Sequence, residues 1–98
     1  MSNAKPYLAR VYVSLKPTVN DPEGSTIAGA LASLGFTSVQ GVRSGKFFQV
    51  RLTADSAEQA WEDIDRACAR LLANPVIETY SFDIEETPAD QDAVRTPG

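Results

Sequence analysis

The sequence predicts an α+β fold, a two-layer sandwich of the ferredoxin-like type with the element order β-α-β-β-α-β. Two helices would cover one face of an antiparallel sheet. Two observations predict this fold. Short stretches alternate apolar and polar residues, as half-buried strands do, and two longer stretches carry apolar residues at helical spacing. These elements fill residues 9–85, which is the size of one small domain.

The first two elements are a strand and a helix. Apolar and polar residues alternate over residues 9–16, and Pro17 ends the predicted strand. Asp21 followed by Pro22 predicts the start of a helix, because aspartate caps a helix well and proline is favoured at its first position. Gly35 is the expected helix terminator, since glycine readily adopts the left-handed conformation.

Residues 39–53 are predicted to form a β-hairpin. Its two strands are residues 39–43 and 46–53, and the second strand alternates apolar and polar side chains. Gly45 would supply the positive φ that a tight hairpin turn requires.

The second helix is predicted to begin at Ser56, because Ser56 and Gln59 have the spacing of a capping box. It must end at Asn74, since Pro75 disfavours helical dihedrals in the residue before it. Alternation resumes over residues 78–85, which predicts the last strand.

Both ends of the chain lie outside the predicted domain. Residues 1–8 are interpreted as an N-terminal extension. Residues 86–98 are polar and without periodicity, which predicts a disordered tail.

Composition excludes several classes of function. The net charge is −4, so the basic face of a nucleic-acid-binding protein is not expected. No apolar run approaches the roughly 20 residues of a membrane span. The chain has no histidine, and its single cysteine, Cys68, is expected to be buried in the second helix. We therefore expect a cytoplasmic, non-catalytic protein that binds no metal or cofactor itself.

The small size of the domain predicts self-association. A core of about 80 residues supplies only a few kcal/mol, and neither a disulfide nor a metal is available to support it. A homodimer or homotetramer is therefore expected. Tyr12 and Phe47 point away from the predicted core, so a face of the sheet is one candidate contact and a sheet edge is another.

Five segments, in order and at matching spacing, together resemble one family. They are VYVSLKP (residues 11–17), DPEG (21–24), LGF (34–36), VRSGK (42–46) and LLANPVIETY (71–80). This set resembles the small subunit of phosphoribosylformylglycinamidine synthase, the PurS family.

The resemblance implies a function. The multi-subunit synthase converts formylglycinamide ribonucleotide to formylglycinamidine ribonucleotide in purine biosynthesis, with ATP and ammonia released from glutamine. A large synthetase subunit would bind ATP and Mg²⁺, and a glutaminase subunit would release the ammonia. The small subunit would hold the two together without an active site of its own.

Residues at the corner after the second helix are predicted to position an edge strand that another chain can pair with. Val76 and Ile77 can equally close the core of their own domain. By position in the family pattern and on the sheet, the candidate interface residues are Tyr12, Lys16, Asp21, Arg43, Lys46, Phe47, Asn74, Pro75, Val76, Ile77, Glu78 and Tyr80.

An alternative function follows from the DPEG segment. It resembles the loop after the first strand in ACT-type regulatory domains, which have the same element order and bind amino acids at their interfaces. This alternative is a small-molecule-binding regulatory module.

Overall fold

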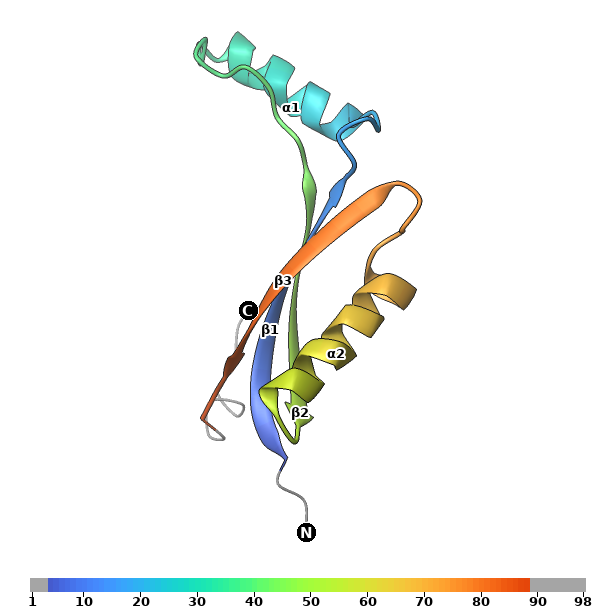
Figure 1. Ribbon diagram of the computed structural model, residues 1–98. Coiled ribbons are helices and arrows are strands. Elements are labelled where there is room, and N and C mark those ends of the chain that lie inside the picture. The colour runs from blue at the N-terminus through green and yellow to red at the C-terminus, as the bar shows by residue number, and fades with distance from the viewer. Residues whose placement is uncertain (1–3, 89–98) are drawn as a thin grey trace.

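Three strands form one antiparallel sheet in the order β2-β1-β3 (Figure 1). The computed structural model describes residues 4–88. Along the chain its elements are β1 (Lys5–Leu15), α1 (Pro22–Ser33), β2 (Gly45–Ala54), α2 (Ala57–Ala67), the π-helical segment η1 (Cys68–Leu72) and β3 (Glu78–Glu86). The predicted α+β class with an antiparallel sheet and two helices is confirmed, with three strands in place of four.

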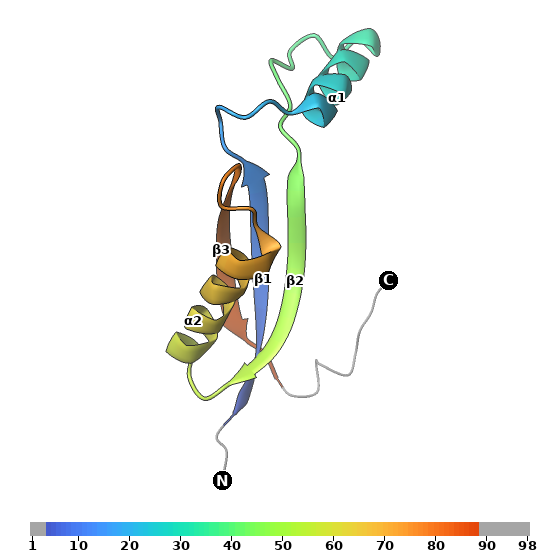
Figure 2. The same cartoon turned by 90° about the vertical axis from the view of Figure 1, so that its right-hand side faces the viewer.

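The core lies between one face of the sheet and α2, as Figure 2 shows. Alternate β1 residues from Tyr7 to Val13 point toward α2 and are buried. Ala60, Ile64 and Cys68 face them at helical spacing. Ser56 starts α2 as predicted, because its hydroxyl accepts a hydrogen bond from the Gln59 amide at 3.1 Å.

The strand β1 begins four residues earlier than predicted, at Lys5 rather than at residue 9. Proline argues against a central strand, since it cannot donate to the ladder. Pro6 is tolerated because it lies beyond the last β1–β3 pair, Tyr7 with Glu86. Its carbonyl still accepts a hydrogen bond from the Thr87 amide at 3.0 Å. Of the predicted tail, Glu86 still belongs to β3, and residues 89–98 lie outside the described residues.

The predicted hairpin is wrong. Residues 39–44 form no strand, and β2 pairs with β1 over its whole length from Gly45. Gly45 makes no positive-φ turn, since Gly35 is the positive-φ glycine of the described residues. Glycine is needed there for close approach, because a Cβ on Gly45 would lie 2.5 Å from the Val13 carbonyl oxygen.

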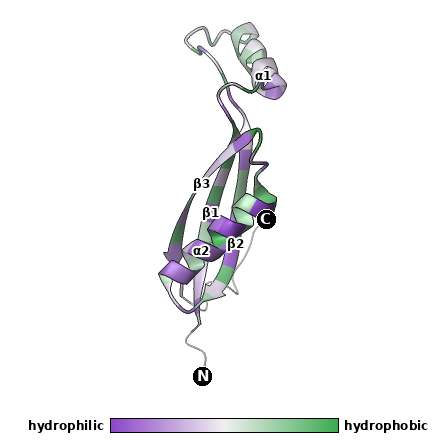
Figure 3. Cartoon of the chain, turned by 45° about the vertical axis from the view of Figure 1, so that its right-hand side comes forward, coloured by the Kyte–Doolittle hydropathy of each residue, from purple (hydrophilic) through white to green (hydrophobic). Residues whose placement is uncertain are grey.

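The two-layer prediction placed α1 beside α2 on the sheet, and this is wrong. The helix projects beyond the end of the sheet (Figure 1), and Figure 3 shows that it carries hydrophobic residues although it lies away from the sheet and α2. Gly24 is its one buried residue. The chain measures 59 × 31 × 18 Å and has a radius of gyration of 17.5 Å. A compact chain of this length would have a radius of about 12–13 Å.

Both ends of α1 follow the local prediction. Asp21 accepts a hydrogen bond from the Gly24 amide at 3.0 Å, and Pro22 is the first helical residue. At the other end, the Phe36 amide donates to the Leu31 carbonyl and Gly35 adopts φ 97°. A glycine in this conformation commonly ends a helix, and the hydrogen bonds around it satisfy carbonyls of the last helical turn. The error therefore concerns where the helix docks, and not whether it forms.

Candidate functional site

Two short segments join α1 to the sheet, residues 16–21 and 42–44, and we call them the neck. Asp21 lies at its centre and is only 4% exposed. Its Oδ2 accepts a hydrogen bond from the Ser44 amide at 2.6 Å, and its Oδ1 accepts one from the Ser44 hydroxyl at 3.1 Å. Together with the Gly24 bond, these contacts tie the start of α1 to the start of β2.

Arg43 closes the other side of the neck. One guanidinium nitrogen, Nη2, donates to the Lys16 carbonyl at 3.0 Å and to the Val19 carbonyl at 2.8 Å. The Lys16 amide in turn donates to the Ile77 carbonyl at 2.8 Å, so the neck is also fastened to the turn before β3. Three of the predicted interface residues, Lys16, Asp21 and Arg43, therefore lie together in the neck, where their hydrogen bonds stabilise the fold.

Charge stabilises this arrangement. Backbone hydrogen bonds from Ser44 and Gly24, with the nearby Arg43 guanidinium, lower the pKa of Asp21 below its ordinary 3.8. A lowered folded-state pKa contributes stability that is fully present above the unfolded pKa and is lost as the pH falls through the folded value.

We therefore expect the neck to remain closed at neutral pH and to loosen below pH 3.8. In an NMR titration, the Ser44 amide shift should move with a midpoint below 3.8. This transition should vanish in Asp21→Asn, which cannot ionise. A midpoint at or above 3.8 in the unmodified chain would contradict the assignment.

A depression of about 450 Å³ lies where the neck meets the sheet. It is lined by residues that include Asp21, Pro22, Glu23, Lys46 and Glu78. Lys46 and Glu78 form an ion pair across it at 3.6 Å. Both Asp21 oxygens are already used within the chain, so Asp21 serves the fold rather than a ligand.

The corner after α2 is fixed by Asn74. Its side-chain oxygen accepts from the Val76 amide at 3.0 Å, and its carbonyl accepts from the Glu78 amide at 2.7 Å. The Asn74 amide in turn donates to the Glu78 carboxylate at 2.7 Å. This reciprocal turn, with Pro75 inside it, explains the abrupt end of the helix and places β3 at the edge of the sheet, as predicted.

The corner residues divide into two groups. Asn74, Pro75 and Val76 are exposed, Val76 by 75%, and Ile77 is also partly accessible. Tyr80 instead packs against the core, where its hydroxyl donates to Asp65 Oδ1 at 2.8 Å. That hydrogen bond, followed by burial, raises the pKa of the Tyr80 hydroxyl. The first group can meet another chain, whereas Tyr80 holds β3 on α2.

On the face of the sheet opposite α2, Tyr12 and Phe47 stack with ring centroids 5.2 Å apart. Both rings are about half exposed. The stack lies on adjacent strands, because Tyr12 is the cross-strand partner of Phe47. The two predicted aromatic residues therefore form one apolar patch, on a sheet face that no helix or strand of residues 4–88 covers.

The sequence analysis missed two features of the site, Ser44 in the neck and the exposed apolar side chains at α1. Ser44 supplies two donors to Asp21 and was not a candidate. The apolar side of α1 was assigned to the core, yet Ile27, Leu34 and Phe36 are exposed. The helical spacing of α1 marked an apolar surface, but it could not show that this surface lies off the sheet and exposed.

This arrangement, a small sheet with one covering helix and a second helix held away from it, can be compared with known proteins. Residues 8–86 match the model of PurS, phosphoribosylformylglycinamidine (FGAM) synthase. The chain belongs to the PurS family. The match covers all five segments that predicted the family, including the DPEG segment behind the ACT-like alternative.

Two relatives illustrate the similarity. The phosphoribosylformylglycinamidine synthase subunit PurS of Synechocystis sp. is 42% identical over 78 residues, covering 80% of this chain and 78% of that protein. The PurS subunit of Bacillus subtilis is 41% identical over 87 residues, covering 85% of this chain and 98% of that protein.

Solved PurS structures share the fold. Methanocaldococcus jannaschii PurS, one of the subunits of formylglycinamide ribonucleotide amidotransferase, is 38% identical with a TM-score of 0.75. The aligned region covers 84% of this chain and 99% of that one. A chain in the structure of PurLQS from Thermotoga maritima is 32% identical with a TM-score of 0.74, covering 84% of this chain and 98% of that one.

Residues 4–88 contain neither a helix that could cross a membrane nor a metal-binding cluster. None of the helices there has the length and apolar character that a membrane crossing requires. No cluster of three or more His, Cys, Asp or Glu side chains in that part of the chain could hold a metal ion. Cys68 is buried, and burial raises the pKa of its thiol, which disfavours the reactive thiolate.

Proposed function

We propose that this chain is a non-catalytic assembly subunit of phosphoribosylformylglycinamidine synthase, which bridges the large synthetase subunit and the glutaminase subunit. The observation that carries the proposal is α1. In a member of the PurS family, a helix with exposed Ile27, followed by exposed Leu34 at its C-terminal end, is held outside the sheet by a dedicated set of hydrogen bonds.

The energetics of α1 support an assembly role. An isolated helix of 12 residues is marginal in water, because short helices rarely offset the cost of their nucleation. Burial of its apolar side against another chain would supply the missing stabilisation, at about 25 cal/mol per Å² of apolar surface. The neck holds the helix ready for that contact and limits the conformational entropy lost on binding.

The chemistry of the complex is assigned to the other subunits. The large synthetase subunit would bind and use ATP and Mg²⁺, and the glutaminase subunit would hydrolyse glutamine. This chain contributes surfaces and no reacting group: it has no histidine, and its cysteine is buried. The complex would operate in the cytoplasm, where its lone thiol suits a reducing environment.

Self-association belongs to the same proposal. A homodimer or homotetramer would cover apolar surface that the single chain exposes, including Leu34 at 74% and Leu71 at 82%. Single exposed apolar residues are normal, but Ile27, Leu34 and Phe36, on α1 and just after it, form a group that marks an interaction surface. The corner residues Asn74 to Ile77 supply a second such surface next to the edge strand β3.

Reconstitution tests the assembly role. We expect the purified chain alone to show no ATPase, glutaminase or synthetase activity. Mixed with the large and glutaminase subunits, it should be required for glutamine-dependent synthesis of formylglycinamidine ribonucleotide. The measurement is product formed per minute with the chain present and omitted. Full-rate synthesis without the chain would reject the proposal, and intact glutaminase and synthetase preparations serve as the controls.

A further inference from the structure

The strand β3 lies at one edge of the sheet (Figure 1), because within residues 4–88 it pairs with β1 alone. An edge strand leaves half of its backbone N–H and C=O groups without a ladder partner. Two bonds just beyond the β1–β3 ladder fix which half this is. At one end the Lys16 amide donates to the Ile77 carbonyl, and at the other the Thr87 amide donates to the Pro6 carbonyl.

The residues of β3 therefore divide into two alternating sets. Bonded positions of an antiparallel pair recur at every second residue, so the odd-numbered residues between Ile77 and Thr87 bond to β1. Tyr80, Phe82 and Ile84 turn their backbone N–H and C=O groups to the free edge. Their side chains pack against the core on the inner face of the sheet, toward α2. Packing thus holds the unpaired backbone groups in the extended form that another strand can join.

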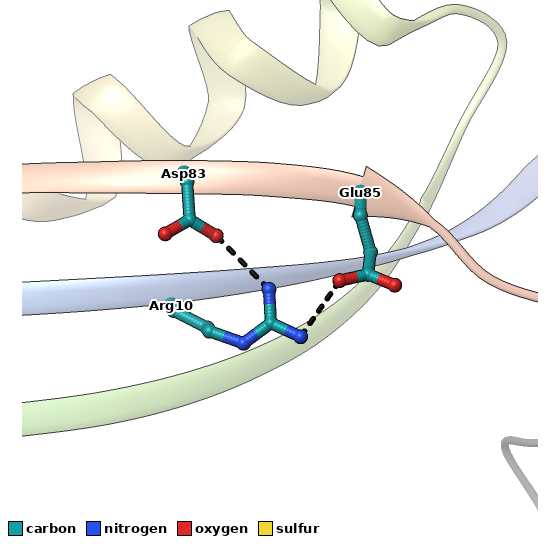
Figure 4. A network of polar contacts seen from close by, with 3 residues as sticks. All are labelled: Arg10, Asp83 and Glu85. Atoms are coloured by element: carbon teal, nitrogen blue, oxygen red, sulfur yellow. Dashed lines mark hydrogen bonds and ion pairs between the residues drawn. The ribbon is translucent and has the colours of Figure 1, made fainter.

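The free edge is also acidic. Four of the nine residues of β3 are carboxylates and none is basic. On the outer face, opposite α2, Figure 4 shows Arg10 forked between Asp83 at 3.0 Å and Glu85 at 2.7 Å, through one oxygen of each carboxylate. One guanidinium offsets only one of these two charges. Both side chains are more than half exposed, and the second oxygen of each has no partner within residues 4–88, so a further cation can reach them.

On the inner face, Trp61 stands beside the same edge. Its ring lies on α2 with its centroid 5.4 Å from that of Phe82, yet the residue is 53% exposed. The Tyr80 hydroxyl donates to Asp65, one helical turn further along α2, so this side of α2 faces β3. Apolar side chains of an added strand would cover the exposed part of the indole.

We propose that β3 binds an extended segment of another protein, which joins the sheet as a fourth strand antiparallel to β3. The side chains of this segment alternate in character. Basic residues lie on the outer face beside Asp83 and Glu85, and apolar residues lie on the inner face beside Trp61. Strand addition of this kind draws affinity from the backbone ladder and specificity from alternate side chains. The inference deepens the proposed assembly role, on which it rests for the source of the strand.

A second copy of the chain fits this edge poorly. Antiparallel β3–β3 pairing would bring two acidic strands together, and like charges directly opposite each other destabilise a sheet. Pairing of β3 with β2 of a second copy would leave a free edge at each end, which builds an open chain of copies rather than a closed oligomer. Charge on an edge strand commonly prevents such pairing. The acidity of β3 therefore selects a basic segment from a different protein.

A model peptide tests the inference on the chain alone. In a peptide of five Val-Lys repeats, the valines can occupy the inner face and the lysines the outer face. Trp61 is the only tryptophan of the chain, so its fluorescence reports binding at this edge. We expect a saturable change in emission, and at least about tenfold weaker binding of five Val-Glu repeats, whose carboxylates would meet those of β3. Equal binding of the two peptides would overturn the inference.

Methylation of the peptide nitrogens separates strand addition from simple charge attraction. Directly opposite residues of an antiparallel bonded pair have side chains on the same face, so the valine amides would face Tyr80, Phe82 and Ile84. Methylation of the valine nitrogens should abolish the fluorescence change. Methylation of the lysine nitrogens, equal in number and in charge, is the matched control and should leave it intact. Equal effects of the two modifications, or loss with methylated lysine alone, would contradict the proposed pairing.

A substitution in the chain locates the binding site. Glu85→Gln removes one charge with little change of shape and should weaken binding of the Val-Lys peptide several-fold. Glu23→Gln, the same substitution on α1, is the matched control and should leave the affinity unchanged. An unaffected Glu85→Gln variant would place the peptide elsewhere and reject the inference. Loss of peptide binding as the chain concentration rises would show that a second copy occupies the edge, which also rejects it.

Failure of this inference is distinguishable from failure of the proposed function. Peptide binding uses the chain alone, whereas the assembly role is read from glutamine-dependent synthesis. If the peptide does not bind and synthesis still requires the chain, the strand addition is wrong and the assembly role stands. If the peptide binds and synthesis proceeds without the chain, the edge site stands and the assembly role is wrong.

Discussion

Replacement of Asp21 by alanine is expected to separate folding from assembly. The variant should keep its sheet and α2, because none of the neck residues belongs to either core cluster. It should lose the fixed position of α1, since the Ser44 and Gly24 amides lose their acceptor. Loss of even one hydrogen bond to a charged group weakens an equilibrium by about tenfold or more. We expect at least that loss in binding to the large subunit.

Three measurements check this result. Circular dichroism should show nearly unchanged secondary structure, small-angle scattering should show a broader distribution of shapes, and sedimentation should show weaker assembly. Glu23→Ala is the matched control, because Glu23 is the next carboxylate in the same turn and forms none of the neck bonds with Ser44. Equal assembly by Asp21→Ala and the unmodified chain would show that the neck does not position α1.

The second large effect is expected in the core. Ile64 is 2% exposed and packs among Val11, Val13 and Cys68. Ile64→Ala should lower the free energy of unfolding by about 2–5 kcal/mol, through lost burial and the cavity left behind. That is comparable with the total of about 3–5 kcal/mol that one small core supplies. A large fraction of the variant should therefore be unfolded at 37 °C.

Urea unfolding followed by tryptophan fluorescence measures this effect, because Trp61 lies on α2 with its ring centroid 5.4 Å from that of Phe82. The matched control is Ile27→Ala, the same substitution on the exposed side of α1. Surface substitutions usually change stability by about 0.5 kcal/mol or less. If the two variants lost equal stability, α1 would belong to the same cooperative core as α2.

Local rules predicted the elements that depend on neighbouring residues. Alternation identified β1, β2 and β3, and the caps at Asp21 and Ser56 are those observed. Each of these signals spans a few residues, so it is readable without knowledge of the rest of the fold. The corner at Asn74 was predicted for the same reason.

The errors arose where distant segments meet. The contact between Asp21 and Ser44 joins residues 23 positions apart, and no local pattern announces it. Gly45 was interpreted as a turn because glycine serves both turns and close backbone contacts, and only the position of Val13 distinguishes them. The helix α1 was placed on its own sheet because an apolar stripe favours burial of that surface, but the stripe does not show where the helix docks.

The neck has a consequence for how such a chain diverges. Because α1 touches its own domain almost only through that junction, its outward-facing side chains can drift in sequence with little effect on the free energy of the sheet and α2. Substitutions on α1 can then change which partner is bound while the stability of the sheet and α2 stays the same. Substitutions in the core can likewise change stability while the partner stays the same.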